Sequence, residues 1–382
     1  MRIRWRILAC LCLGGLLVWF LADAGAVRDS VAEALALCAR SVVPSLFPFL
    51  VASSALLALG FGELAAPWLA GLMEPLFRVP GAGSAALVLG LVGGYPIGAK
   101  TAADLYRENL VSREEAERLL AFCNNSGPAF ILGVVGAGVF GSGRVGLLLY
   151  LTHAAASILV GILFRFHGGR DAGREKRPVR ATFETVRASS AFTGAVVKAL
   201  QSTLSICAFV VFFSVVLELL SAYGVLAALA QVLAMFGVGE EWARRLVAGL
   251  LELSSGVSSL TGAGSQGVSM AAFMLGWAGL SVHCQVLAFL GDSGLSMGTY
   301  LWGKLLHGLI SAGLLGLLTR LFPLDAPVSA YLAEQAETLA ALDLHQALTI
   351  SSVSAWCVWL LFLLLAARGM KKSSGKSHAH GV

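Results

Sequence analysis

A run of glycines with a proline and a lysine interrupts an otherwise apolar region at Gly90–Thr101, which reads Gly-Leu-Val-Gly-Gly-Tyr-Pro-Ile-Gly-Ala-Lys-Thr. A continuous membrane helix disfavours these residues, because Gly weakens helix propagation and Pro removes a backbone donor and clashes with the preceding turn. Inside a membrane, backbone broken in this way has to be buried in protein or line a wet cavity. We therefore predict that the chain is organised around this break and a partner break further along.

The composition places the chain in a membrane. Of its 382 residues, 57% are hydrophobic and only 13% are charged, whereas about a quarter of the residues in soluble domains are charged. We expect an all-α polytopic protein of the cell membrane. The net charge of +5 comes from Lys and Arg in the termini and loops, which indicates membrane topology and not nucleic-acid binding. The seven cysteines have no metal-type spacing, so no metal or other cofactor is expected.

Hydropathy and loop charge divide the chain into six predicted segments. The first holds the apolar run Ile7–Ala22, interpreted as an uncleaved signal-anchor with its amino end in the cytoplasm, although Ala22-Asp23-Ala24 also resembles a signal-peptidase site. By the positive-inside rule, the basic loop and tail are cytoplasmic and the acidic loop is external. The segments are 1–40 (signal-anchor and outer loop), 41–166 (first repeat), 167–198 (basic loop), 199–322 (second repeat), 323–346 (acidic loop) and 347–382 (last transmembrane helix and basic tail).

The two long segments resemble each other. Leu120–Gly127 aligns with Leu287–Gly294, and the glycine-rich stretch aligns with Gly249–Leu260, which contains Ser-Ser-Gly-Val-Ser-Ser. The first repeat ends beside the basic loop and the second beside the acidic loop, so we predict that the repeats are inverted and that their breaks face each other. Inverted repeats with discontinuous helices are typical of transporters whose site lies near the bilayer midplane.

The breaks supply candidate ligands for a solute. A half-helix that begins at a break presents free N–H groups and a partial positive charge, which attract an anion. Lys100 would add a full charge there, or would extend to the interface as an ordinary surface lysine. The candidate substrate-binding residues are Gly94, Tyr95, Gly98, Lys100, Asn124, Asn125, Ser126, Ser254, Ser255 and Ser258.

Five charged or titratable residues are candidates for coupling transport to H⁺ or Na⁺. Asp292 is the aligned counterpart of Asn125, and an intramembrane carboxylate is costly and usually functional; it would couple an ion or pair with Lys304. Interhelical hydrogen bonding is the alternative role for the two histidines. The candidates are Asp292, Lys304, His307, His153 and Glu252.

One pattern suggests enzymatic chemistry. Gly291–Gly294 fits the Gly-x-Ser-Gly of intramembrane serine proteases, with His307 or His153 as the base. A duplicated helix break explains Ser-Gly at both aligned positions better than a single nucleophile does, so we predict that the protein is not an enzyme.

Several motifs together resemble a known family. They are Pro44–Leu50, Glu74–Arg78, Gly93–Lys100, Ser112–Arg118 and Asn124–Pro128. The chain, from about Ser41 to Phe322, resembles the sporulation integral membrane proteins of the YlbJ type, which belong with the nucleoside-recognition Gate domain proteins. No individual ligand residue carries over from this resemblance.

The resemblance implies an architecture related to concentrative nucleoside transporters. It also implies a protein that passes dipicolinic acid across the outer forespore membrane from the mother cell, which supports spore maturation. Two alternatives stay open: a nucleoside transporter of the Gate family, and a non-transporting component of spore cortex or envelope assembly. The expected partners are the lipid bilayer, a small anionic solute (dipicolinate) or a nucleoside, and H⁺ or Na⁺; an oligomer is left open, and no nucleic acid is expected.

Overall fold

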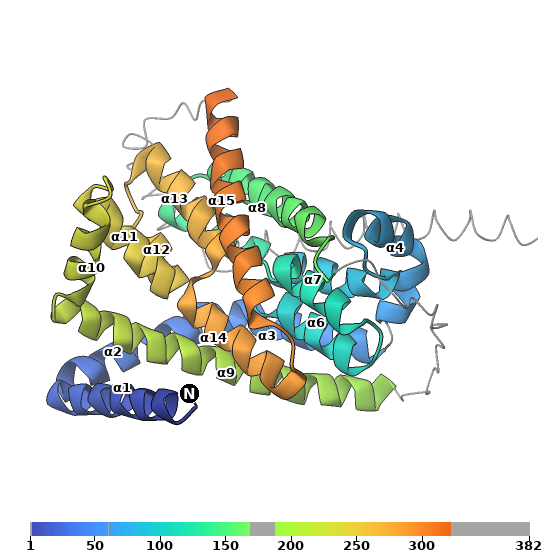
Figure 1. The fold of residues 1–382 in the computed structure, drawn as a ribbon, viewed down its shortest axis with the longest axis horizontal. Coiled ribbons are helices and arrows are strands. Elements are labelled where there is room, and N and C mark those ends of the chain that lie inside the picture. The colour runs from blue at the N-terminus through green and yellow to red at the C-terminus, as the bar shows by residue number, and fades with distance from the viewer. Residues whose placement is uncertain (1, 60, 169–187, 322–382) are drawn as a thin grey trace, which may run out of the picture.

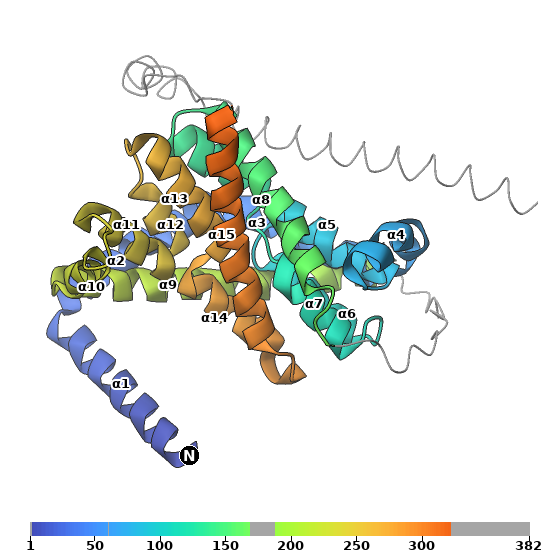
Figure 2. The ribbon, with the colours of Figure 1, turned by 45° about the horizontal axis from the view of Figure 1, so that its top comes forward.

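The computed structural model describes residues 2–59, 61–168 and 188–321, and the described part is all helical (Figure 1). The predicted acidic loop 323–346, the last transmembrane segment 347–382 and most of the basic loop lie outside the described residues. The first part contains α1 (Arg2–Ala22), α2 (Ala24–Leu37), the π-helical turn η1 (Cys38–Val42), α3 (Val43–Ala58), α4 (Phe61–Phe77) and the 3-10 turn η2 (Gly81–Gly83). Figure 2 shows α1 projecting away from the rest of the molecule.

Two groups of helices then follow, and after α9 and α10 the second group repeats the order of the first. The first group contains α5 (Ser84–Gly93), α6 (Ile97–Arg107), α7 (Arg113–Cys123), the π-helix η3 (Ala129–Val139) and α8 (Gly143–Phe164). The second group contains α9 (Ala188–Ala222), α10 (Val225–Ala234), α11 (Glu240–Leu251), α12 (Leu253–Ser258), α13 (Gly264–Trp277), α14 (Gly279–Leu290), the turn η4 (Gly291–Ser293) and α15 (Met297–Leu321). Each group has two helices broken near their middle, α5–α6 and α7–η3 in the first and α11–α12 and α13–α14 in the second, before one long helix.

Four described helices are long and apolar enough to cross a membrane, and two sharply bent helix pairs raise the number to six if each pair is one span. The four are Gly143–Phe164, Phe192–Ala222, Gly264–Leu290 and Met297–Leu321. The helix α9 begins at Ala188, so the predicted basic loop 167–198 ends about ten residues too late. The helix continues through Lys198 because this stretch contains no Gly after residue 194 and no Pro to stop its propagation.

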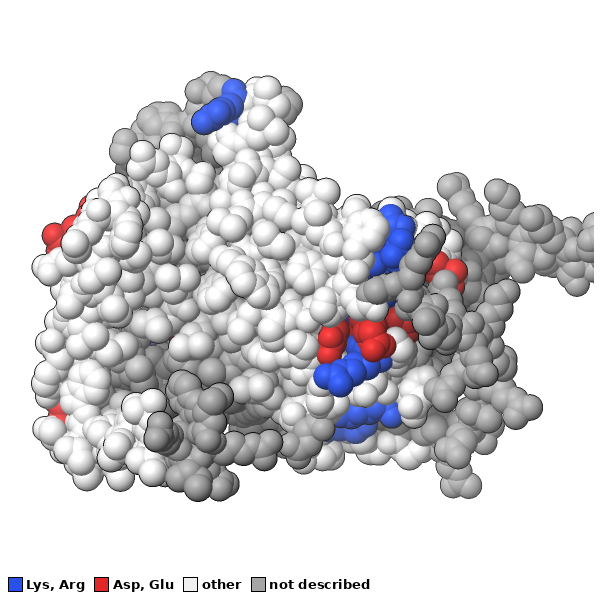
Figure 3. Space-filling view, viewed as in Figure 1, with Lys and Arg blue, Asp and Glu red and all other residues white. Residues whose placement is uncertain are grey.

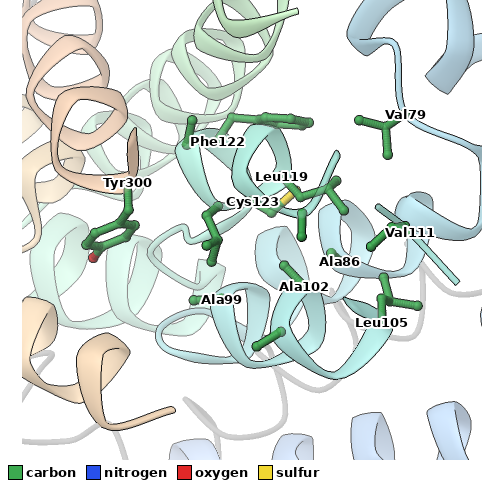
Figure 4. Packing of buried hydrophobic residues seen from close by; sticks show 14 of the residues in the cluster. Val79, Ala86, Ala99, Ala102, Leu105, Val111, Leu119, Phe122, Cys123 and Tyr300 are labelled. Carbon is green, nitrogen blue, oxygen red and sulfur yellow. The ribbon is translucent and has the colours of Figure 1, made fainter. Parts of the chain in front are cut away.

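The helix α15 lies at the centre of the fold and packs against α13, α8 and α7. A Cβ built on Gly276 would lie 2.4 Å from the Cα of Gly308, so α13 and α15 approach backbone to backbone, as small residues allow in membrane bundles. The largest apolar core joins α6, α7 and α15: in Figure 4, Ala99 and Ala102 of α6 lie close to Leu119 and Cys123 of α7.

Charge is confined to a few places on the face seen in Figure 3. Acidic and basic side chains gather over α6 and α7, while most of this face carries no charge. This distribution is that of a protein whose larger surface contacts lipid and whose α6–α7 end contacts water.

Candidate functional site

The two breaks of the first group cross each other in direct backbone contact. Gly94 has a φ of +81°, a conformation that favours glycine, between the end of α5 and the start of α6. A Cβ built on Gly90 or Gly98 would lie 1.8 or 1.9 Å from the carbonyl oxygen of Cys123, the last residue of α7. Because they have no side chain, the glycines of Gly90–Thr101 allow the break that follows Cys123 to pack directly against this backbone. The predicted mate, Gly249–Leu260, is not the segment that these glycines contact.

The second group has its breaks at Glu252 and at Ala278–Gly279, where both residues have a φ of 82°. A Cβ on Gly279 would lie 3.0 Å from the N atom of Leu253, so these two breaks also meet. The alignment of Asn125 with Asp292 is therefore wrong, because Gly291–Ser293 is the turn that joins α14 to α15, one connection after the break. The side chain of Asp292 lies outside the described side chains.

Glu252 caps its own half-helix. Its carboxylate accepts hydrogen bonds from the backbone N–H groups of Ser254 (3.0 Å) and Ser255 (2.6 Å). The N–H groups that were candidates for an anion at this break are thus bound to the protein's own carboxylate. Ser258, at the end of α12, is exposed.

The first group's second break contributes to a buried polar cluster shared by both groups. We call this set the central polar cluster, and none of its members is more than 3% exposed. Its residues are Asn124, Asn125 and Ser126 from the α7–η3 break, His153 from α8, His283 from α14, and Tyr300, Lys304 and His307 from α15.

Lys304 has three contacts in this cluster. Its Nζ donates to the carbonyl oxygen of Asn124 at 2.7 Å and lies 3.2 Å from Nδ1 of His307. It also lies 5.3 Å from the centre of the Tyr95 ring. Within residues 2–168 and 188–321 it forms no ion pair, and a fully buried ammonium without a carboxylate is costly.

The hydrogen bonds of the two histidines define where their protons lie. Nε2 of His153 accepts from the backbone N–H of Ser126 at 3.0 Å, so the proton of the neutral ring is on Nδ1. Nε2 of His307 donates to the carbonyl oxygen of His153 at 2.9 Å, which leaves its Nδ1 as an acceptor toward Lys304. The centroids of the His153 and His307 rings are 4.3 Å apart.

Several polar atoms of the cluster have no hydrogen-bond partner in the described part of the chain. Buried polar groups are almost always satisfied by protein, ordered water or a ligand, so a solute that both donates and accepts would find partners among these atoms. They are Oδ1 of Asn124, Oδ1 of Asn125, Oγ of Ser126, Nδ1 of His153 and Nε2 of His283.

The other predicted residues lie around the cluster. Lys100 is half-buried and pairs with Asp104, one turn along α6, at 3.0 Å. The hydroxyl of Tyr95 donates to the carbonyl oxygen of Leu275 in the second group. The structure thus joins Asn124–Ser126, both histidines and Lys304, brings the Tyr95 ring beside them, and gives Lys100 a separate partner.

Two members of the cluster were not among the predicted site residues. Tyr300 precedes Lys304 by one turn of α15, and its hydroxyl contacts Asn124 Nδ2 at 3.2 Å and His283 Nδ1 at 3.1 Å. The signal for Tyr300 was its shared helix face with Lys304, whereas His283 lies in an apolar run with no flanking pattern. No group of three His, Cys, Asp or Glu residues that would suit a metal ion occurs among the described residues.

A second polar contact joins the groups at the charged end. The carboxylate of Glu117 accepts from Nε of Arg113 (3.1 Å) and from the backbone N–H of Ser296 (2.9 Å), and it lies 3.2 Å from Nε2 of His167. Burial raises the pKa of Glu117, but the hydrogen bonds from His167, Ser296 and Arg113 outweigh it, so the pKa lies below its usual value. The helix α7 carrying this residue begins with a capping box formed by Ser112 and Glu115 and is not one of the candidate spans.

Comparisons with known proteins give three matches. The Gate family model, described as nucleoside recognition, matches residues 39–164, a range that includes both breaks of the first group. The sporulation integral membrane protein YlbJ of Bacillus subtilis (strain 168) is 31% identical over 294 residues, which are 71% of this chain and 72% of that protein. A solved structure of CNTnw in its intermediate 3 state is 15% identical, with a TM-score of 0.47, and the match covers 85% of this chain and 86% of that one.

Proposed function

Because the chain belongs to the family of the sporulation integral membrane protein YlbJ, we propose that it is a multi-pass membrane transporter of a small organic anion. The observation that carries this proposal is the buried Lys304, which has no carboxylate partner within the described chain. An isolated buried charge costs several kcal/mol, of the order that a bound counter-ion offsets. A transported anion is the natural counter-ion, because it arrives from water and leaves again.

We propose dipicolinate as the anion and the outer forespore membrane as the site of action. The family relationship supports a role in sporulation, and the chemistry of the cluster suits a planar dicarboxylate. Carboxylates accept strong hydrogen bonds from charged and neutral donors. The donors here are Lys304 and the N–H at Nδ1 of His153, which has no other partner in the described chain.

A nucleoside is the second candidate solute. The observation that favours it is the set of neutral groups without partners, the Oδ1 atoms of Asn124 and Asn125 and the hydroxyl of Ser126. Amide and hydroxyl groups suit the hydroxyls of a ribose and the edges of a base. The matching family model is also described as nucleoside recognition.

Uptake into proteoliposomes tests the proposal. We expect labelled dipicolinate to accumulate, with no competition from a tenfold excess of unlabelled nucleosides. Lys304→Met, which keeps the length of the side chain and removes its charge, should abolish uptake. Lys198→Met makes the same change at an exposed lysine of α9 and should transport normally.

The other outcomes are distinct. Uptake of labelled nucleoside that is not competed by dipicolinate would replace the anion with the second candidate. Purified protein that moves neither solute while a spore-envelope protein co-purifies would favour the non-transporting role. A deletion strain whose spores hold normal dipicolinate would remove this solute from the proposal.

A further inference from the structure

We infer that Lys304 takes up one proton with each anion that binds, so that the resulting ammonium and one carboxylate of the anion form an ion pair inside the central polar cluster. This inference rests on the proposed function and adds the co-transported ion to it. It follows from the number of acceptors around one nitrogen atom and from the charges that surround it.

The acceptors around Lys304 match a neutral amine. A neutral amine has two N–H donors, and Nζ has two acceptors, the carbonyl oxygen of Asn124 at 2.7 Å and Nδ1 of His307 at 3.2 Å. The second acceptor is held in place because the other nitrogen of His307 donates to the carbonyl oxygen of His153. An ammonium has a third N–H, and no third acceptor of the described chain lies within hydrogen-bonding distance of Nζ.

The groups that face Lys304 supply no negative charge. Those on its own helix are Tyr300 and His307, and the neighbouring elements contribute His153 from α8, His283 from α14 and the Tyr95 ring from the α5–α6 connection. Histidine and tyrosine side chains are neutral or cationic at neutral pH. The ring of Tyr95, 5.3 Å from Nζ, attracts a cation but carries no net charge that would balance it.

Three carboxylates of the described helices have other partners. Glu252 accepts from the N–H groups of its own half-helix, and Glu117 is bound by Arg113 and Ser296. Asp104 pairs with Lys100. None of them forms an ion pair with Lys304, so no carboxylate among the described side chains supplies the charge that an ammonium at this position requires, and an anionic solute can supply it.

The charge balance of the step is simple. The amine of Lys304 and one proton from the aqueous phase form an ammonium, and its third N–H donates to one carboxylate of the solute, so that this carboxylate and the ammonium are buried as an ion pair. The second carboxylate of dipicolinate keeps its charge and accepts from the N–H at Nδ1 of His153, so the bound complex of one dianion and one proton carries a net charge of −1. Neither charge is stable in the cluster alone, because each would carry the full cost of leaving water. The anion and the proton therefore enter and leave together, which couples uptake to the proton gradient.

Calorimetry of purified wild-type protein with sodium dipicolinate, in buffers of different ionisation enthalpy, counts the protons taken up. We expect about one proton per bound anion, and an affinity that weakens by up to about tenfold per pH unit between about pH 7 and pH 9, where carboxylates stay ionised. Lys304→Arg tests directly whether residue 304 takes up the proton, because a guanidinium stays protonated before and after the anion binds. It should bind the anion with no proton uptake and a flat pH profile, while Lys198→Arg should match the wild type.

Each outcome has one meaning. Anion binding by the wild type without proton uptake would overturn this inference and leave the proposed function intact. Proton uptake by Lys304→Arg equal to that of the wild type would also overturn it. If Lys304→Arg does not fold, the wild-type proton count and pH slope decide alone. No dipicolinate binding by folded wild-type protein would overturn both the inference and the proposed substrate.

Discussion

The contact between Gly98 and the end of α7 allows a quantitative prediction. In Gly98→Ala the new Cβ would lie 1.9 Å from the carbonyl oxygen of Cys123, whereas real contacts of this type are essentially never under 3.0 Å. The two breaks would have to separate by 3.0 − 1.9 = 1.1 Å at least. The obstacle is backbone, which cannot rotate away as a side chain can.

The expected cost follows from known substitutions. Overpacking a well-filled site costs about 1–3 kcal/mol, and the upper end applies to a backbone clash. Replacing Gly by Ala returns about 0.4–1 kcal/mol by restricting the unfolded chain. For a chain of 382 residues, the net loss of about 2 kcal/mol corresponds to a fall in Tm of about 2–3 °C.

Thermal unfolding in detergent, followed by gel-filtration recovery, measures this effect. Gly313→Ala is the matched control, since it adds the same methyl group to α15 where nothing lies within 4 Å. Its Tm should equal or exceed that of the wild type. A Gly98→Ala protein with the Tm and the uptake of the wild type would show that the two breaks do not cross as described.

Three further predictions concern charged side chains. Glu117→Gln should lower Tm at neutral pH, because it removes about 1.5–3 kcal/mol of charge-assisted hydrogen bonding. The pKa of Glu117 in the folded protein lies below the usual 4.5, so this stabilisation is present above pH 4.5 and is lost as the pH falls through the folded pKa. When Tm is measured against pH, the values for wild type and variant should therefore converge in acid. Glu252→Ala should cost about 0.5–2 kcal/mol as a lost helix cap, measured as Tm, and an unchanged Tm would contradict the capping role. Lys100→Met should lower Tm slightly and change the dipicolinate Kd by less than about twofold, because its charge is paired with Asp104; loss of binding would restore it as an anion ligand.

Local features of the fold were predictable from sequence where residue chemistry dictates the backbone. The break at Tyr95–Pro96 lies inside the predicted interruption Gly90–Thr101, and α7 begins where Ser112 and Glu115 form a reciprocal cap. In each case a residue with an unusual backbone preference or a reciprocal cap leaves few alternatives.

The long-range pairing of the breaks was not predictable. The break at Ala278–Gly279 lacks the Asn and Ser residues of its counterpart after Cys123, so alignment by residue type selected the Ser-Gly of the α14–α15 turn instead. The geometry at Ala278 depends on its left-handed backbone and not on side-chain chemistry. Similarly, the acceptor for Lys304 is a backbone carbonyl released by a break, which no pattern of side chains reveals.

The cap formed by Glu252 has a consequence for stoichiometry. Two related halves suggest two equivalent solute sites, one at each set of breaks. In the second half, however, the protein's own carboxylate binds the N–H groups of Ser254 and Ser255. The two halves thus differ: in the second half a carboxyl side chain of the protein occupies the N–H groups of the break, whereas the break of the first half contributes to the cluster around Lys304. Equilibrium binding should therefore saturate at one anion per chain.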